Sequence, residues 1–329
     1  MRCIRIHDYG GPEVLRRCEL PVPSPGPGEV LVRVRHAGIN FMDVHTRQGK
    51  YASSRTYPVR LPCTLGMEGA GEVVEAGPGT GPWHAGERVA WCLSWGSYAE
   101  FAVVPCERLV SVPQALPLEM AAAALFHGCT AHYLAHDVGR LSPGSSCLVH
   151  AASGGIGQLL VQMARRAGAR VFATTSSETK RDTVRALGAD EVIPYDAGGF
   201  ADAVRASTSG AGVDVVFDPV GRATLRDSFR AARRRGLVVN FGAVSGSVRD
   251  LDPIELGEAG SLYLTRPRLA DYLADSAAAQ RRADDVFGGL LEGWLKVRLA
   301  SRHTLDDVEV AHAALEARAL IGKPLLDLL

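Results

Sequence analysis

The pattern of apolar and polar positions divides the chain into two parts. Up to about residue 120, short alternating runs such as residues 30–35 and 97–104 are separated by stretches rich in Gly and Pro. Alternation with a period of two is typical of strands with one buried face, and residues 71–77 and 87–91 fit the same description. Short strands with turns at this spacing predict a barrel-like β domain.

From Glu119 onward the pattern alternates between helices and strands. An Ala-rich helix is expected to begin at Met120, and a second helical stretch covers about residues 130–138. The expected strands are residues 147–151, 170–175, 191–194, 213–218, 237–242 and 261–265. Strands 213–218 and 237–242 are almost continuously apolar, as parallel strands buried on both faces are. We therefore predict a doubly wound α/β domain around a six-stranded parallel sheet.

The tail from about residue 268 is mostly helical. We expect helices over residues 284–295 and 304–318, the second with Thr304 as its cap, and a short closing strand at residues 324–326. A tail this short cannot bury a core of its own, so we expect it to pack on the first domain. The predicted domains are therefore residues 1–122 with 268–329, and residues 123–267.

A glycine-rich turn links the strand at residues 147–150 to a helix with one apolar face. The turn reads Ala151-Ala152-Ser153-Gly154-Gly155-Ile156-Gly157. Gly154 would let a diphosphate approach the backbone at the helix N-terminus, and Gly157 would let the helix pack closely on the strand. Ala152 replaces the first glycine of the usual fingerprint, so the match is partial. Its strand–turn–helix context nevertheless indicates a dinucleotide site.

The next strand ends in hydroxyl groups followed by cations. These residues are Thr174, Thr175, Ser176, Ser177, Lys180 and Arg181. An NAD site usually has Asp or Glu at this strand end, about 20 residues after the loop, to hold the ribose hydroxyls. Hydroxyls with cations suit a ribose phosphate instead, so we predict NADPH. Glu178 lies past the strand end, and the alternative is that Lys180 and Arg181 are solvated charges on the following helix.

Composition and charge restrict the classes of function. The chain has 329 residues, 47% of them apolar, and equal numbers (36 each) of Lys+Arg and Asp+Glu. That length is ample for two globular domains, and zero net charge argues against nucleic-acid or membrane-surface binding as the main role. The polar N-terminus, the lack of any apolar run of membrane-spanning length and seven scattered cysteines favour a cytoplasmic protein with reduced thiols. We expect residues 233–235, three arginines, at a helix C-terminus.

Six stretches resemble the zinc-independent NADPH:quinone oxidoreductases (zeta-crystallin-like) of the medium-chain dehydrogenase/reductase superfamily. They are residues 37–43, 66–71, 150–157, 187–193, 241–246 and 260–267. The resemblance runs along nearly the whole chain. It implies a GroES-like β-rich catalytic domain and a Rossmann domain that binds NADPH. It also implies a homodimer, in which the apolar edge strand at residues 261–265 pairs with its symmetry mate.

The resemblance also implies roles for individual residues. It places the nicotinamide against Asn40, Phe41, Met42, Asp43, Phe241, Gly242 and Val244, with Leu264, Thr265 and Arg266 near the carboxamide. It places the phosphates against Ser153, Gly154, Gly155, Ile156 and Gly157, and the 2′-phosphate beside Thr175, Ser176, Ser177 and Lys180. Further cofactor contacts are expected from Tyr133, Tyr195 and Arg318.

A tyrosine over the substrate is a further feature that the resemblance implies. Tyr51 stands at that position and could donate a proton or a hydrogen bond to a substrate oxygen or carbanion. The loop here is longer than usual, so Tyr57 is the alternative. The family often has Tyr where this chain has His45.

No metal is expected. Zinc-containing members of the superfamily place Cys where Asn40 stands and His where Met67 stands, and neither Asn nor Met is a useful zinc ligand. His132 and His136 have the i,i+4 spacing of a chelating pair, but no acidic or thiol partner is in view.

These observations predict an NADPH-dependent quinone reductase, with Asn40 and Tyr51 as the catalytic candidates. The alternative is a reductase of activated C=C bonds in an enal, enone or enoyl thioester, with Tyr51 as proton donor. A third hypothesis is a protein that binds NADPH without turnover.

Overall fold

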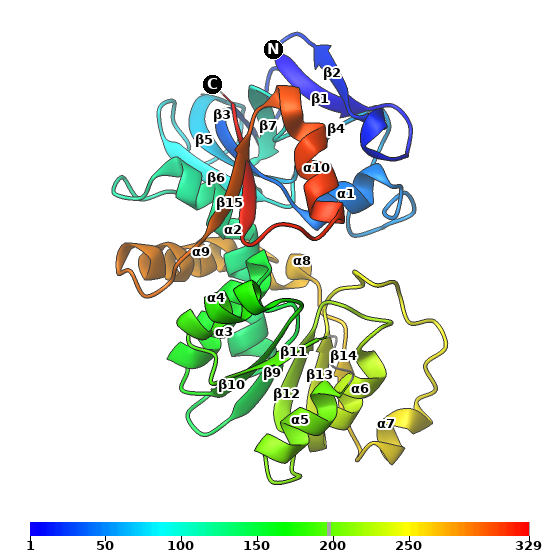
Figure 1. The fold of residues 1–329 in the computed structure, drawn as a ribbon. Coiled ribbons are helices and arrows are strands. Elements are labelled where there is room, and N and C mark those ends of the chain that lie inside the picture. The colour runs from blue at the N-terminus through cyan, green and yellow to red at the C-terminus, as the bar shows by residue number, and fades with distance from the viewer. Residues whose placement is uncertain (196–198, 329) are drawn as a thin grey trace. The chain divides into compact units, whose positions relative to one another are not determined.

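The computed structural model describes residues 1–195 and 199–328, which form two compact units (Figure 1). Unit 1 comprises Met1–Cys129 and Tyr272–Leu329, and unit 2 comprises Thr130–Asp271. The returning tail thus belongs with the N-terminal region. The chain passes from unit 1 to unit 2 inside one helix, whereas the sequence placed the domain boundaries after residue 122 and before residue 268.

Unit 2 is built on a parallel sheet that has six strands within the described residues. The strands are β9 (Ser146–Val149), β10 (Arg170–Thr175), β11 (Glu191–Pro194), β12 (Val213–Asp218), β13 (Ala232–Asn240) and β14 (Tyr263–Thr265). Their order is β11-β10-β9-β12-β13-β14, and every pair is parallel. The predicted doubly wound sheet is confirmed, and the strand order reverses next to β9, where the glycine-rich turn begins.

Helices cover both faces of this sheet. They are α3 (Gly155–Arg166), α4 (Glu178–Ala186), α5 (Phe200–Ser207) and α6 (Leu225–Ala231), with the short α7 (Ile254–Glu258) near the edge. Right-handed crossovers place α3 and α4 on one face and α5 and α6 on the other, because the two halves of the sheet run in opposite directions from β9. Figure 1 shows α5 and α6 side by side.

Unit 1 contains two β-sheets. The larger consists of β3 (Glu29–Gly38), β5 (Glu68–Ala76), β6 (Arg88–Cys92), β7 (Phe101–Pro105), β8 (Leu109–Ser111), β15 (Leu299–His303) and β16 (Lys323–Asp327). The smaller has the order β2 (Arg16–Glu19), β1 (Arg2–Ile6) and β4 (Cys63–Thr64). Pairing of β16 with β3, Leu325 opposite Gly38, brings the end of the chain beside its first long strand.

The remaining helices of unit 1 flank these sheets. They are α1 (Phe41–Arg47), α9 (Ser276–Leu291) and α10 (Val308–Glu316), with single 3₁₀ turns at Pro12–Val14, Cys106–Arg108 and Leu305–Asp307. Two further helices, α2 (Leu118–Tyr133) and α8 (Leu269–Tyr272), contain the points at which the chain passes between units. Within the ranges that the structure describes, no helix is both long enough and apolar enough to cross a bilayer.

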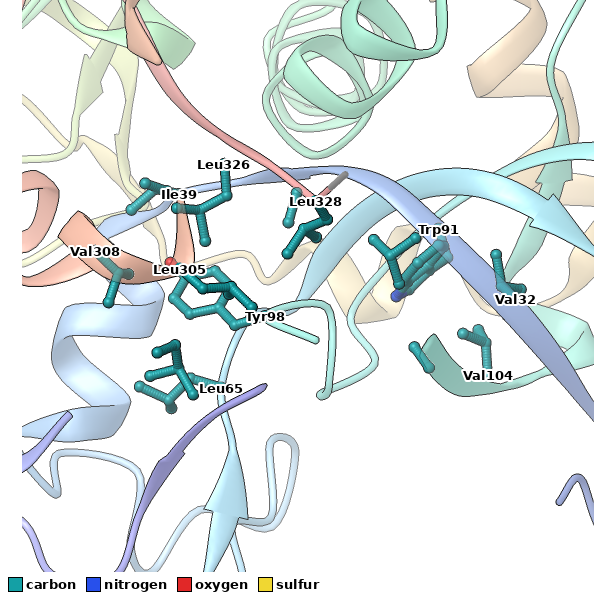
Figure 2. Close-up of a cluster of buried hydrophobic side chains, with 14 of the residues drawn as sticks. Val32, Ile39, Leu65, Trp91, Tyr98, Val104, Leu305, Val308, Leu326 and Leu328 are labelled. Atoms are coloured by element: carbon teal, nitrogen blue, oxygen red, sulfur yellow. The ribbon is translucent and has the colours of Figure 1, made fainter. Parts of the chain in front are cut away.

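Apolar side chains from strands, loops and α10 fill the core of unit 1. Figure 2 shows Trp91 near Val32 and Val104, and Tyr98 among Leu65 and Leu305. Trp91 and Tyr98 are both fully buried. Fully burying a large apolar side chain stabilises a fold by about 1.5–3 kcal/mol, so this cluster holds strands distant in sequence together.

Three predicted elements differ from the structure. The helix expected at residues 284–295 is α9, which starts eight residues earlier because the Asp275 side chain accepts a hydrogen bond from the amide of Ala278 (2.7 Å) and caps it. The two helices expected from residues 120 and 130 are one continuous α2 followed by a π-type turn, Leu134–Val138. Residues 233–235 do follow a helix end, because α6 ends at Ala231, but they already belong to β13, where Arg233 pairs with Asp214 of β12 at 2.6 Å.

Candidate active site

The turn after β9 has the geometry of a phosphate-binding loop. Ala151 has a positive φ of 50°, which turns the chain, and Gly154 in extended conformation precedes the first turn of α3. A Cβ on Gly157 would lie 2.5 Å from the carbonyl oxygen of Ala151 and 2.7 Å from Cα of Ala152, so only glycine allows this approach of helix and strand. A Cβ on Gly154 would meet only one atom within 4 Å. The helix N-terminus with its free amide groups therefore stays open to an anion.

The end of β10 carries a polar atom suited to a ligand. Thr175 is buried, and its Oγ1 has no hydrogen-bond partner among the protein groups described. Ser176 and Ser177 follow at the surface, and Nζ of Lys180 lies 3.3 Å from Oγ of Ser176. Glu178 is held by Arg181 at 2.5 Å. The strand end thus offers hydroxyls and an ammonium, and the carboxylate of Glu178 is already paired, which fits a phosphorylated ribose better than a free diol.

The loop after β13 is held by side-chain and backbone contacts. Nδ2 of Asn240 donates to the carbonyl oxygens of Asp218 and Gly242, both at 3.1 Å. A Cβ on Gly242 would collide with the carbonyl oxygen of Pro219, so the close approach requires glycine. The neighbouring candidates Phe241, Val244, Leu264 and Thr265 are half-buried, and Arg266 is exposed.

The two tyrosines predicted to contact the cofactor have different surroundings. Tyr133 is buried at the end of α2. Tyr195 is half-buried, and its backbone amide donates to the carbonyl oxygen of Thr175 at 2.8 Å, which fixes it beside the end of β10.

A buried polar chain supports the strand ends of unit 2, and sequence reasoning did not find it. Nδ1 of His150 lies 2.9 Å from Oγ1 of Thr174, and its Nε2 lies 3.1 Å from Oγ of Ser228. Ser228 in turn donates to Asp218 at 2.9 Å. Burial lowers the pKa of His150, although the Asp218 carboxylate opposes this. Through His150, which follows β9 and directly precedes the glycine-rich turn, these contacts join the end of β9 to β10, β12 and α6.

In unit 1, the predicted catalytic residue Asn40 caps α1. Its backbone amide donates to Oδ2 of Asp43 at 2.8 Å. Its side-chain Nδ2 donates to the carbonyl oxygen of Gly38 (3.2 Å) and to Oε2 of Glu68 (3.1 Å). Its Oδ1 accepts from Nζ of Lys323 at 2.6 Å. A carboxamide has two N–H groups, so both donors of Asn40 are used inside the protein.

Glu68 and Lys323 form the centre of this arrangement. Nζ of Lys323 lies 2.5 Å from Oε2 of Glu68, and Oε1 of Glu68 accepts from the amide of Phe126 at 2.6 Å. Asn40, Glu68 and Lys323 are 2%, 0% and 1% exposed. Every oxygen of the pair has a partner, as a buried ion pair requires. We refer to these three residues as the buried triad.

An aromatic row extends from α1 into the following loop. Ring centroids lie 6.1 Å apart for Phe41 and His45, 6.2 Å for His45 and Tyr51, and 5.8 Å for Tyr51 and Tyr57. All four side chains are half-buried. Burial lowers the pKa of His45 to about 4, with a smaller effect from Lys50, so the ring is neutral at pH 7. The structure thus brings both tyrosine candidates to one place and does not favour either.

The other candidates in unit 1 differ in their exposure. Met42 and Asp43 are buried, and the Asp43 carboxylate faces inward, so a cofactor contact at Asp43 would use its backbone. Arg318 is exposed just after α10, with a φ of 55°. In the part of the chain that the structure describes, no three His, Cys, Asp or Glu side chains are grouped so that they could hold a metal ion.

Comparison with known proteins agrees with the sequence motifs. Residues 26–114 match the family model of the alcohol dehydrogenase GroES-like domain, and residues 155–269 match the model named zinc-binding dehydrogenase. The chain is 37% identical over 328 residues to a 2-haloacrylate reductase from a Burkholderia species, and the matched region covers 98% of this chain and 97% of the relative. It is 37% identical over 324 residues to a quinone oxidoreductase of Pseudomonas aeruginosa, with 98% of each chain covered.

A solved structure extends the comparison to the fold. The Escherichia coli quinone oxidoreductase complexed with NADPH matches with a TM-score of 0.95 at 34% identity, covering 99% of this chain and 100% of that one. The GroES-like and Rossmann folds expected from the sequence are confirmed. The chain therefore belongs to the quinone oxidoreductase family of the medium-chain dehydrogenase/reductase superfamily.

Proposed function

We propose that this protein is a zinc-independent enzyme that uses NADPH to reduce quinones. The observation that carries the proposal is the state of Asn40, which stands where zinc-containing relatives have a cysteine ligand. Its side-chain carboxamide is fully bonded to Gly38, Glu68 and Lys323. Met67, which stands in place of their histidine, is buried. A quinone needs no metal to polarise it, because it accepts a hydride or an electron readily.

The residues of unit 2 supply the binding side of this proposal. The glycine-rich turn and the N-terminus of α3 suit the diphosphate, while Thr175, Ser176 and Lys180 suit the 2′-phosphate. When bound, NADPH supplies the hydride, so the protein has to bind, orient and exclude water. The remaining candidate contacts, from Tyr133 to Arg318, belong to the same proposal.

The buried triad and the aromatic row are the groups of unit 1 that this proposal places beside the electron acceptor. Because Asn40 has no N–H left to donate, its role is to present a fixed amide plane beside the start of α1. A donor to a reduced acceptor oxygen must come from another group, and the phenol of Tyr51 or Tyr57 is the right kind. The neutral ring of His45 adds a flat, uncharged surface suited to a planar acceptor.

A second function, reduction of an activated C=C bond, is favoured by the similarity to a 2-haloacrylate reductase. Alkene reduction adds a proton to carbon after the hydride, so it depends on a proton donor more strongly than quinone reduction does. The variants Tyr51→Phe and Tyr57→Phe distinguish the two functions and serve as matched controls for each other. If alkene reduction is a main activity, one of them should lower it about 100-fold while quinone reduction falls less than about threefold. Equal losses on both substrates would contradict a proton-donor role.

The proposed enzyme is a cytoplasmic homodimer. The dimer is supported by the open edge of β14, where Tyr263 is 65% exposed. Ile254 on nearby α7 is exposed to the same extent. Light scattering should give twice the chain mass, and Leu264→Lys should shift it towards the monomer. A parent protein that scatters as a monomer at all concentrations would overturn the dimer. The seven unpaired cysteines suit a reducing compartment.

A further inference from the structure

The last residue of α10, Glu316, binds the point at which α1 ends and a loop begins. Oε2 of Glu316 accepts from Nη2 of Arg47 at 2.7 Å, and Oε1 accepts from Nε2 of Gln48 at 2.6 Å. Arg47 is the last residue of α1, and Gln48 is its C-cap. One carboxylate therefore holds both residues that end α1, and Figure 1 shows α10 beside α1.

The surroundings of Glu316 distinguish this contact from an ordinary surface ion pair. The Arg47 side chain is 0% exposed and the Glu316 side chain is 30% exposed. Water and salt screen such a pair less than a pair that is exposed on both sides. Glu316 also stands in the last turn of a helix, where the negative end of the helix dipole disfavours a carboxylate. A residue that departs from a local preference in this way indicates a specific need for the carboxylate.

The loop that starts at Gln48 carries both tyrosine candidates. Its first turn is tight, because Gly49 has a φ of 75° and the amide of Lys50 donates to the carbonyl oxygen of His45 at 2.9 Å. Tyr51 follows this turn directly, and its ring centroid lies 6.2 Å from that of His45. Since so tight a turn leaves the backbone little freedom, the position of Tyr51 depends on where Gln48 is held.

We propose that Glu316 is a positioning residue for the reduction of the electron acceptor. Through Arg47 and Gln48 it fixes the end of α1. Through the turn that follows, it fixes the phenol of Tyr51, whose ring centroid lies 5.8 Å from that of Tyr57. A group that donates to the acceptor must be held in place closely, because a displacement of about 1 Å can lower a rate about 100-fold. The inference rests on the proposed function, which assigns this loop to the acceptor.

The kinetic test uses a variant that leaves the buried charge of Arg47 paired. Gln48→Leu keeps a similar volume and removes only the hydrogen bond to Oε1 of Glu316. Since a hydrogen bond to a charged group is worth roughly a factor of 10 in an equilibrium, the KM for the quinone should rise about 5- to 20-fold. The KM for NADPH should change less than about twofold, because the residues proposed to bind its phosphates lie in unit 2.

Hydrogen exchange followed by mass spectrometry tests the position of the loop without any turnover. The amides of Lys50, Ala52 and Ser54 donate to backbone carbonyl oxygens, so they exchange slowly while the loop keeps its shape. In Gln48→Leu, peptides covering residues 48–57 should exchange about fivefold faster or more, and peptides from β9 to β13 should exchange as in the parent. Glu309→Gln, a change at an exposed glutamate of α10, is the matched control and should alter neither exchange nor KM.

The two measurements together separate this inference from the proposed function. Unchanged exchange in residues 48–57 of Gln48→Leu would overturn the inference, as would faster exchange there with an unchanged KM for the quinone. Faster exchange throughout the chain would show a general loss of stability and would overturn it too. A parent protein that turned over neither a quinone nor an enone would instead overturn the proposed function, and exchange would still decide whether Glu316 holds this loop.

Discussion

Replacing Lys323 by methionine tests the buried triad most sharply. Methionine fills a similar volume but removes the ammonium that lies 2.5 Å from Glu68 and 2.6 Å from Asn40. Glu68, at 0% exposure, then keeps only neutral partners, the amides of Asn40 and Phe126. A buried carboxylate without its cation is strongly destabilising, so the variant should lose most of its stability through Glu68.

The size of the loss can be bounded. Breaking a buried ion pair by removing one partner costs about 3–5 kcal/mol, because the other partner is left as an unpaired buried charge. Adding Glu68→Gln removes the charge and should recover about 2 kcal/mol or more.

The assay is urea unfolding followed by tryptophan fluorescence. All four tryptophans, Trp83, Trp91, Trp95 and Trp294, lie in unit 1, so the signal reports the unit that contains the triad. Arg17→Met is the control, because the pair of Arg17 with Asp306 is exposed and should be worth at most about 1 kcal/mol. A loss below about 1 kcal/mol in Lys323→Met, or a double variant no more stable than the single one, would refute the reasoning.

Further predictions concern the cofactor and acid stability. Lys180→Gln should raise the KM for NADPH about 10- to 100-fold and leave the KM for NADH unchanged, because one charge-assisted hydrogen bond to phosphate is worth about 1.5–3 kcal/mol. Equal effects on both cofactors in steady-state assays would contradict a 2′-phosphate contact. Burial lowers the pKa values of His45 and His312 to about 4 and about 3. Between pH 7 and pH 5 each should lower the free energy of unfolding by about 2 kcal/mol, because the unfolded state takes up the protons first. Burial raises the pKa of Asp43 to about 7, which contributes about 2 kcal/mol in the opposite direction. Unfolding at both pH values should therefore show a smaller acid loss for His312→Phe and a larger one for Asp43→Asn than for the parent, and the reverse order would disprove these signs.

Most of the fold of unit 2 could be predicted from short-range sequence patterns. The apolar runs at β12 and β13 and the turn before α3 are readable because strand period, glycine position and helix period all lie within a few residues of each other. The ends of helices were predicted less accurately. The start of α9 was placed too late because its first turns are rich in alanine, so its apolar and polar faces differ little there.

The buried triad could not be predicted in the same way. Asn40, Glu68 and Lys323 lie far apart in the sequence and meet only because β3 pairs with both β5 and β16. The available signal was a charged residue in the first position of a strand. Lys323 precedes Pro324-Leu325-Leu326, and Glu68 is the first residue of β5. Either charge alone suggests a surface position, because lysine and glutamate are rarely buried unless paired.

The central claim is tested by NADPH oxidation with a simple para-quinone and an α,β-unsaturated ketone in parallel, before and after treatment with EDTA. We predict a higher kcat/KM for the quinone and no effect of EDTA. Preference for the ketone would move the enzyme to the alkene reductases, and loss of activity with EDTA would contradict a zinc-independent site at Asn40 and Met67.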